Sequence, residues 1–443
     1  MVQIFKKRPF IIVACVLAFA LVGGAFGVHA FVQGDSFRRW ISKKVSRSLR
    51  ADGQFESLTW DGATFHSPKF TATETGHSKL GSLHLSNISA HVNWWGLFQW
   101  HWVIDRISAD EAEADFANHP VAVPQTSGAK RAPGIKLSQF LPSDLVIENI
   151  DIATVNLHWE TNHGEKGQWL GSTLHSKRIN ADQWEIHATG GKARHAAYPE
   201  LQIDEASATL NQKSFEIHQI DTKVMTGGEM HLKGSIAIDH TLDAHLDCTF
   251  SGLDVEQTLP NSWHITGRGA GQVAYQGDLN RFDRGRFTGS IQIADSTMDL
   301  SPLFGKMKQF VKLGGLDEVR LDAISVSFDY QDQKGAFSNL KASYQDQIRI
   351  EGGGSFEPDT LAGAIQIGLA SNILTWIPGS AESVFTEDRD GLRWATANIS
   401  GSPEKPKEDL TKRLLGAAEK KMSKEFKDNA KDAAKTLLEF LRH

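Results

Sequence analysis

The chain has 443 residues, of which 47 are Lys or Arg and 53 are Asp or Glu, so its formal net charge is −6. Hydrophobic residues make up 40% and charged residues 23%, a globular composition that excludes wholesale disorder. Only Cys15 and Cys248 are cysteines, too few for a disulfide framework or a Cys-ligated zinc site. Basic charge is concentrated in residues 1–50 and 403–443, and the acidic stretch between them disfavours nucleic-acid binding.

The amino terminus predicts a membrane anchor. Residues 9–32 contain no charged side chain and are long enough to cross a bilayer as a helix. Three basic residues precede this run, so we expect residues 1–8 to form a cytoplasmic tail and the run itself to be a transmembrane anchor. Two alternatives are a signal peptide cleaved after Ala30 and a lipoprotein processed at Cys15.

Residues 33–50 are predicted to form a juxtamembrane amphipathic helix that lies on anionic headgroups. The residues expected to contact the membrane surface are Arg38, Arg39, Trp40, Lys43, Lys44 and Arg47. An alternative is a solvated basic helix. Taken literally, these charges would hold the body in the cytoplasm, but its β-rich character favours export.

From about Leu80 the dominant hydrophobic period is two, and Gly, Asn or Asp recurs about every ten residues. This pattern predicts a mainly β protein, built as an elongated, curved, antiparallel, groove-like sheet. The expected segments are an N-terminal β region (51–116), a linker (117–137), a middle β region (138–286) and a C-terminal β region (287–402). A short internal helix is expected over 301–313, with Ser301 as its N-cap.

One face of such a sheet is apolar and must be covered. If the sheet curls, that face lines a groove in which acyl chains lie while headgroups stay in water. The alternative is a closed sandwich filled by its own side chains. The groove candidates are Leu83, Leu85, Val92, Leu246, Phe250, Ile324, Val326, Phe328, Ile348, Ile350, Ile365, Ile367 and Leu369.

Residues 403–443 are predicted to form an amphipathic helix with a stripe of Leu, Met, Phe and Ala opposite a row of lysines. Such a helix could plug the open end of a groove, cover the sheet as a lid, lie on a membrane or dock on a partner helix.

The sequence gives no support for catalysis. The 18 histidines are scattered, and neither an H-E-x-x-H nor a G-x-S-x-G element occurs. We therefore expect no enzymatic activity, no catalytic residue, no metal ligand set and no cofactor.

Three stretches resemble the AsmA-like proteins, a family of bacterial envelope proteins related to AsmA, TamB and YhdP. They are the amino-terminal anchor, LGSLHLSNISAHVNWWGLFQWHWVIDRISADEAEADF (80–116), and the unit 287–402 ending in ATANISGSPEKPK. Residues 138–214 match least.

The resemblance implies a single-pass inner-membrane protein whose body lies in the periplasm. Its β-groove would bind phospholipid and support lipid transport or outer-membrane biogenesis, with outer-membrane assembly proteins as possible partners. One alternative is an envelope scaffold that binds no lipid and recruits assembly partners through residues 403–443. Another is a secreted soluble binding protein.

Overall fold

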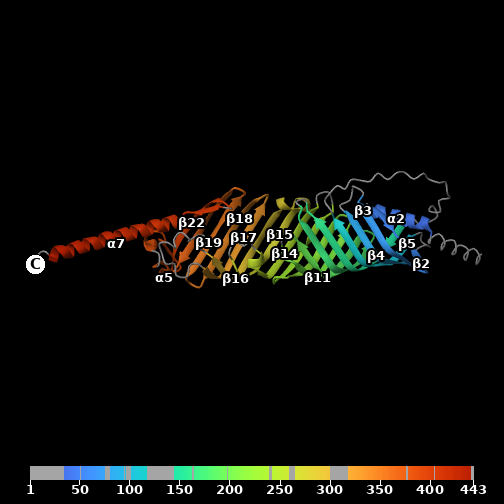
Figure 1. Cartoon of the computed structure of the whole chain (residues 1–443), viewed down its shortest axis with the longest axis horizontal. Coiled ribbons are helices and arrows are strands. Elements are labelled where there is room, and N and C mark those ends of the chain that lie inside the picture. The colour runs from blue at the N-terminus through green and yellow to red at the C-terminus, as the bar shows by residue number, and fades with distance from the viewer. Residues whose placement is uncertain are drawn as a thin grey trace, which may run out of the picture. The chain divides into compact units, whose positions relative to one another are not determined.

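A computed structural model confirms a mainly β protein (Figure 1). Its residues divide into two compact units, Met1–Gln212 (unit 1) and Lys213–His443 (unit 2), and the division falls within the predicted middle region. The residues that the structure describes are 34–49, 51–74, 80–93, 95, 101–116, 144–161, 164–196, 198–238, 242–258, 265–299, 318–375, 378–403 and 405–440.

Unit 1 contains one described helix and a series of strands. They are α2 (Asp35–Leu49), β1 (Ala51–Phe55), β2 (Thr59–Asp61), β3 (Thr64–Glu74), β4 (Ser82–Asn93), β5 (His101–Phe116), β6 (Asp144–Ile147), β7 (Asn149–Glu160), β8 (Lys166–Asn180), β9 (Gln183–Thr189), β10 (Lys192–His195) and β11 (Leu201–Asn211).

The sheet of unit 1 is mixed, which corrects the antiparallel prediction. Strands β1 to β5 pair antiparallel, as do β7 to β11, but β5 pairs with both β6 and β7 in parallel. Ala112 lies opposite Val155 and Ala114 opposite Leu157 in this parallel ladder. A short hairpin turn cannot join a parallel pair, and β5 and β6 are accordingly separated by 27 residues (117–143) in the sequence.

Helix α2 forms as predicted, but its apolar side packs against the sheet, where the sequence had suggested membrane contact. Phe37 is 4% exposed and its ring lies 5.6 Å from Phe65 and 6.4 Å from Trp102, measured between centroids. Trp40 stacks on Phe37, and Val45 and Leu49 pack on a second cluster around Phe70. Burial of this side leaves only the polar side of α2 for other contacts.

Unit 2 consists of a meander and several helices. Its elements are β12 (Ser214–Val224), β13 (Glu229–Ala237), β14 (Asp243–Asp254), α3 (Val255–Thr258), β15 (Arg268–Asp278), η4 (Leu279–Arg284), β16 (Arg286–Asp299), β17 (Glu318–Gln331), β18 (Lys334–Tyr344), β19 (Ile348–Glu357), β20 (Thr360–Leu369), α5 (Ser371–Leu374), α6 (Ser380–Ser383), β21 (Glu387–Arg389), β22 (Leu392–Ser402), β23 (Lys405–Glu408) and α7 (Leu410–Phe440). From β12 to β20 each strand pairs antiparallel with the next. Strand β22 pairs antiparallel with β20, and also with the short strands β21 and β23.

One end of the unit 2 sheet is covered by α5, α6 and the first turns of α7, which we call the plug. Phe385 and Leu414 are each 1% exposed and Leu374 is 3% exposed, and they pack with Leu369 and Ala395 of the sheet. An ion pair of 2.9 Å between Lys421 and Glu382 joins α7 to α6. The helix predicted over 403–443 begins only at Leu410, because Lys405–Glu408 form β23, and its first turns cover the sheet.

Helices and side chains also occupy two outer strand edges. The N–H of Gly53 in β1 donates to Ser46 Oγ (2.8 Å), and that of Phe55 donates to Ser42 Oγ (3.4 Å), so α2 occupies this edge. In β22 the N–H of Asn398 donates to Asp409 Oδ1 (2.8 Å). Burial alone would raise the pKa of Asp409, but the hydrogen bonds from Asn398 and the nearby charge of Arg413 together hold the pKa below its ordinary value.

The predicted anchor (9–32), linker (117–137) and short helix (301–313) lie outside the described residues. Among the helices that the structure does describe, none has both the length and the apolar character needed to cross a bilayer.

Candidate apolar-face site

Strand register places the ten candidate residues of unit 2 on one face, which we call the unit 2 apolar face. Phe250 lies across from Gly271, which pairs with Ile291, and Ile291 in turn pairs with Val326. Farther along the sheet, Ile350 pairs with Ile367. Paired residues of an antiparallel ladder project to the same side. The complete candidate set on this side is Leu246, Phe250, Ile324, Val326, Phe328, Ile348, Ile350, Ile365, Ile367 and Leu369.

Burial divides this set into two groups. Ile324, Ile348 and Leu369 are at most 8% exposed and belong to the cluster that the plug completes, so they are core residues and not ligand contacts. The residues that remain half-buried are Leu246, Phe250, Val326, Phe328, Ile350, Ile365 and Ile367. Only this second group keeps the solvent access that a ligand would need.

Glycines let aromatic rings lie flat along this face. A Cβ on Gly289 would lie 2.9 Å from Cζ of Phe328, and one on Gly271 would lie 2.9 Å from Cζ of Phe250. Each ring therefore covers the backbone of the neighbouring strand. The result is a smooth apolar surface with aliphatic side chains beside the rings.

Cys248 lies on the same face, because it pairs with Val273 on one side and Leu232 on the other. Its thiol is free and half-buried, and burial raises its pKa above the ordinary value. A single thiol within the candidate site offers a built-in chemical reporter of what covers the face.

The three candidates in unit 1 have a structural role. Val92 is 2% exposed and packs with Phe37 beneath α2, so it is a core residue. Leu83 and Leu85 are half-buried and pack on the cluster that includes Val45 of α2. Helix α2 thus covers this part of the unit 1 sheet.

An aromatic row runs along the strand ends at one border of the unit 2 apolar face. Tyr275, Phe287 and Tyr330 are neighbours across adjacent strands, with ring centroids 4.9 and 6.1 Å apart. Phe356 continues the row at 6.1 Å, and Phe282 of η4 stacks on Tyr275 at 4.6 Å. We call these five residues the aromatic rim.

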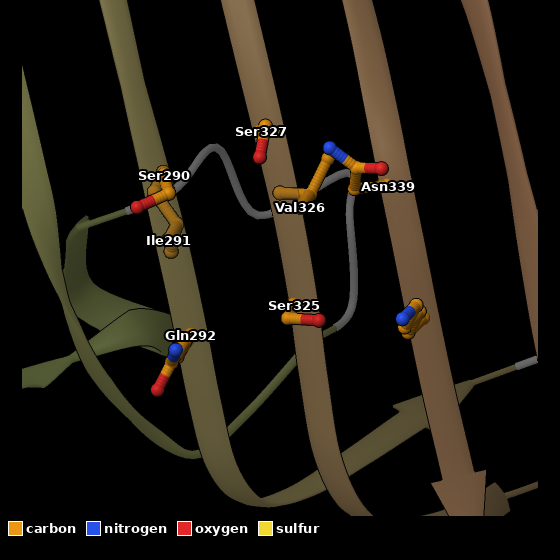
Figure 2. Close-up of a pocket in the computed structure, with 8 residues that line it drawn as sticks. Ser290, Ile291, Gln292, Ser325, Val326, Ser327 and Asn339 are labelled. Atoms are coloured by element: carbon orange, nitrogen blue, oxygen red, sulfur yellow. The ribbon is translucent and has the colours of Figure 1, made fainter.

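Each unit also contains a pocket among its described residues. The pocket in unit 2, of about 200 Å³, is lined by polar residues of β16, β17 and β18 together with Ile291 and Val326 (Figure 2). The polar residues are Ser290, Gln292, Ser325, Ser327, Asn339 and Lys341. These residues alternate with Ile291 and Val326 along the strands, so they project away from the apolar face. A pocket of about 400 Å³ in unit 1 is lined in part by Asp110, Asp151 and His175.

Cross-strand polar pairs account for several of the histidines. His175 bonds to Asp151, which also pairs with Arg106 at 3.1 Å. His231 bonds to Asp221 at 2.7 Å, and this hydrogen bond lowers the pKa of Asp221. Within the described ranges, His, Cys, Asp and Glu do not gather in groups of three that could hold a metal ion.

The predicted membrane-surface residues of α2 fall into two groups, one exposed to solvent and one in contact with neighbouring residues. Arg39, Lys43 and Arg47 are exposed and recur at a spacing of four, so they form one basic stripe. Arg38 instead bonds to the carbonyl of Glu56 (2.6 Å), and Lys44 lies 6.0 Å from the ring of Trp40.

Sequence reasoning missed the glycines and tyrosines of the apolar face. Gly271 and Gly289 look like turn signals, whereas they lie within strands beneath aromatic rings. Tyr275 and Tyr330 carry a polar group, so a search for aliphatic alternation passes over them. The sequence did contain a signal for them, because Tyr275 lies two residues after Val273 and Tyr330 two residues after Phe328, the spacing of side chains on one face of a strand.

No protein-family model matches the chain, and no curated protein or solved structure shows significant similarity to it. The site is therefore interpreted from its own residues.

Proposed function

We propose that this chain binds phospholipid acyl chains on the unit 2 apolar face, and that it serves lipid transport or outer-membrane biogenesis from an inner-membrane anchor with its body in the periplasm. The observation that carries the proposal is the register, which brings seven half-buried apolar candidates from β14, β17, β19 and β20 to one side of the meander. The AsmA-like resemblance supplies the cellular setting. The proposal includes no catalytic step and no cofactor.

The dimensions and chemistry of the face suit a lipid tail. The ten strands β12 to β20 and β22, at a spacing of about 4.8 Å, make a face roughly 40 Å long. Burial of each CH₂ group contributes about 0.8 kcal/mol, so an acyl chain gains several kcal/mol from a partly covered surface. Residues filling a closed sandwich would be fully buried, and Val326 and Phe328 are not.

The first test uses the native thiol. In the full chain with Cys15→Ser, Cys248 is the only cysteine. Purified in a mild detergent that retains lipid, the protein should carry phospholipid by mass spectrometry and label slowly with a maleimide. Removing the lipid by detergent exchange should speed labelling several-fold. A folded, lipid-free protein from the first preparation would contradict the proposal.

Two variants at adjacent positions of β17 provide a matched comparison. Val326→Asp places a charge on the apolar face, whereas Ser327→Asp places the same charge on the polar face. We expect the first variant to lose most of its phospholipid and the second to keep it. Circular dichroism checks that both are folded, and the thiol assay tests the proposal even if Val326→Asp fails to fold.

A second candidate function rests on a separate observation. Beyond the plug, Met422 is 48% exposed and Phe426 is 78% exposed, so α7 presents large apolar side chains to solvent. We propose as the alternative an envelope scaffold that recruits assembly proteins through this helix. Crosslinking from position 422 should then capture protein partners, and the same partners should be lost when Phe426→Ser is added.

A further inference from the structure

We infer that the turn η4, beside the aromatic rim, is the site at which a zwitterionic phospholipid headgroup binds while its acyl chains lie on the unit 2 apolar face. This inference rests on the proposed function, which does not itself assign a place to the headgroup. It identifies both a binding site and the class of lipid that the site would accept.

The first observation is the position of η4. Phe282 stacks on Tyr275 at 4.6 Å and meets Phe287 edge-on at 5.1 Å, so the turn is fixed to the border of the apolar face. Phe282 is nevertheless 52% exposed, which leaves part of an aromatic ring at the boundary between apolar surface and water. Aromatic side chains favour this boundary in membranes as well.

The second observation is the charge on the turn. Arg281 and Arg284 flank Phe282, both are exposed, and neither forms an ion pair with any described residue. Arg286, by contrast, is held by both oxygens of Asp329. Guanidinium groups bind phosphate through paired donors, so Arg281 and Arg284 are the two groups at this border available for a phosphodiester.

The third observation concerns carboxylates. Asp283 lies between the two arginines, and burial together with Asp278, Asp243 and Asp283 raises the pKa of Tyr275. These negative charges oppose a purely anionic headgroup. They fit an ammonium group, which an aromatic face also attracts. Cations and anions side by side therefore match a headgroup that carries both a phosphate and an ammonium.

The turn η4 is continuous with the unit 2 apolar face, where the acyl chains would lie. Tyr275 pairs with Phe287 at the rim, and the next positions inward on the same face are Val273, Gly289 and Phe328. A lipid whose phosphate sits at Arg281 or Arg284 can thus extend its tail directly onto half-buried apolar residues, without crossing a polar segment.

The test uses two photoreactive phosphatidylethanolamines with the full chain in mild detergent. A lipid with the photoreactive group on its headgroup should label the peptide that contains residues 279–286. A lipid with the group in its tail should label strands β14 to β17. Tail labelling of the apolar face with headgroup labelling elsewhere would overturn this inference and leave the proposed function standing. Absence of labelling by either lipid would overturn both.

Charge variants test the lipid class. Arg281→Glu with Arg284→Glu should reduce bound phosphatidylethanolamine at least several-fold, whereas Lys233→Glu with Lys341→Glu, exposed on the polar side, should not. Inorganic phosphate at millimolar concentration should not displace the lipid, since the tail supplies most of the binding. Equal lipid content in both double variants, displacement by phosphate alone, or preference for an anionic headgroup would each contradict the inference.

Discussion

At the scale of single residues, glycine and aromatic side chains act together to shape the apolar face. Gly271 and Gly289 provide the space in which Phe250 and Phe328 lie flat, and Gly354 does the same for Phe337. A β-branched residue at any of these glycines would lift a ring off the sheet. The glycines, which add nothing to hydrophobicity, are therefore as important to the surface as the side chains that line it.

Gly289→Val should destabilise unit 2. The new side chain would meet Phe328 and the carbonyl oxygen of Gln272, and overpacking of this kind costs about 1–3 kcal/mol. Thr288→Val, one position away and projecting to the other face, serves as the control and should change stability little. Urea denaturation of the two variants measures the difference, and equal midpoints would show that the ring does not depend on this glycine.

Cys248 should react as a thiol with a raised pKa. Burial disfavours the thiolate, so at neutral pH less of the reactive form is present than in an unfolded chain. In the Cys15→Ser protein we expect the alkylation rate to rise through a higher pH in the folded state than in urea. Superimposable pH profiles in the two states would contradict the assignment.

At the scale of elements, the alternation of apolar and polar residues predicts strands well, because it reports which face of a strand is buried. Ile324, Val326 and Phe328 alternate in the sequence and lie together in β17. The short helices α5 and α6 were not predicted, because four residues are too few to show a helical period. Their apolar residues, such as Ile373 and Leu374, are recognisable only through the sheet they cover.

The two parts of α7 should respond differently to the same substitution. Leu414 is 1% exposed within the plug, so Leu414→Asp buries an unpaired charge and should cost at least about 3 kcal/mol. Phe426 is 78% exposed, and Phe426→Asp should change the stability by no more than about 0.5 kcal/mol. Chemical denaturation of both variants decides the matter, and similar losses would mean that the distal helix also packs.

At the scale of the whole molecule, the sequence predicted the antiparallel meander seen in unit 2 but not the parallel pairing in unit 1. The antiparallel meander of unit 2 follows from short turns, such as Asp332–Gln333 between β17 and β18, where both residues adopt positive φ. The parallel joint of β5 and β7 joins strands that are distant in sequence, and local period carries no information about such pairing. Likewise, the basic stripe of α2 was predicted, but the covering of its apolar side was not.

The serines of α2 should limit self-association. Ser42→Ala with Ser46→Ala removes the acceptors for the N–H groups of Gly53 and Phe55 and leaves the outer edge of β1 unsatisfied. We expect a loss of about 1–2 kcal/mol and concentration-dependent association of the full chain in detergent, measured by sedimentation velocity. Ser36→Ala, on the exposed side of α2, is the control, and identical sedimentation of both proteins would contradict this role.

The parallel joint also has a kinetic consequence. Hairpins such as β17–β18 close very short loops and form within about 1–10 μs, whereas β5 and β7 must meet across all the residues from Phe116 to Asn149. Closing a longer loop costs more entropy before any pairing compensates for it. We therefore expect the β1–β5 and β7–β11 segments of unit 1 to form first as separate meanders. Their union along β5 and β7 then sets the rate at which unit 1 reaches its native state.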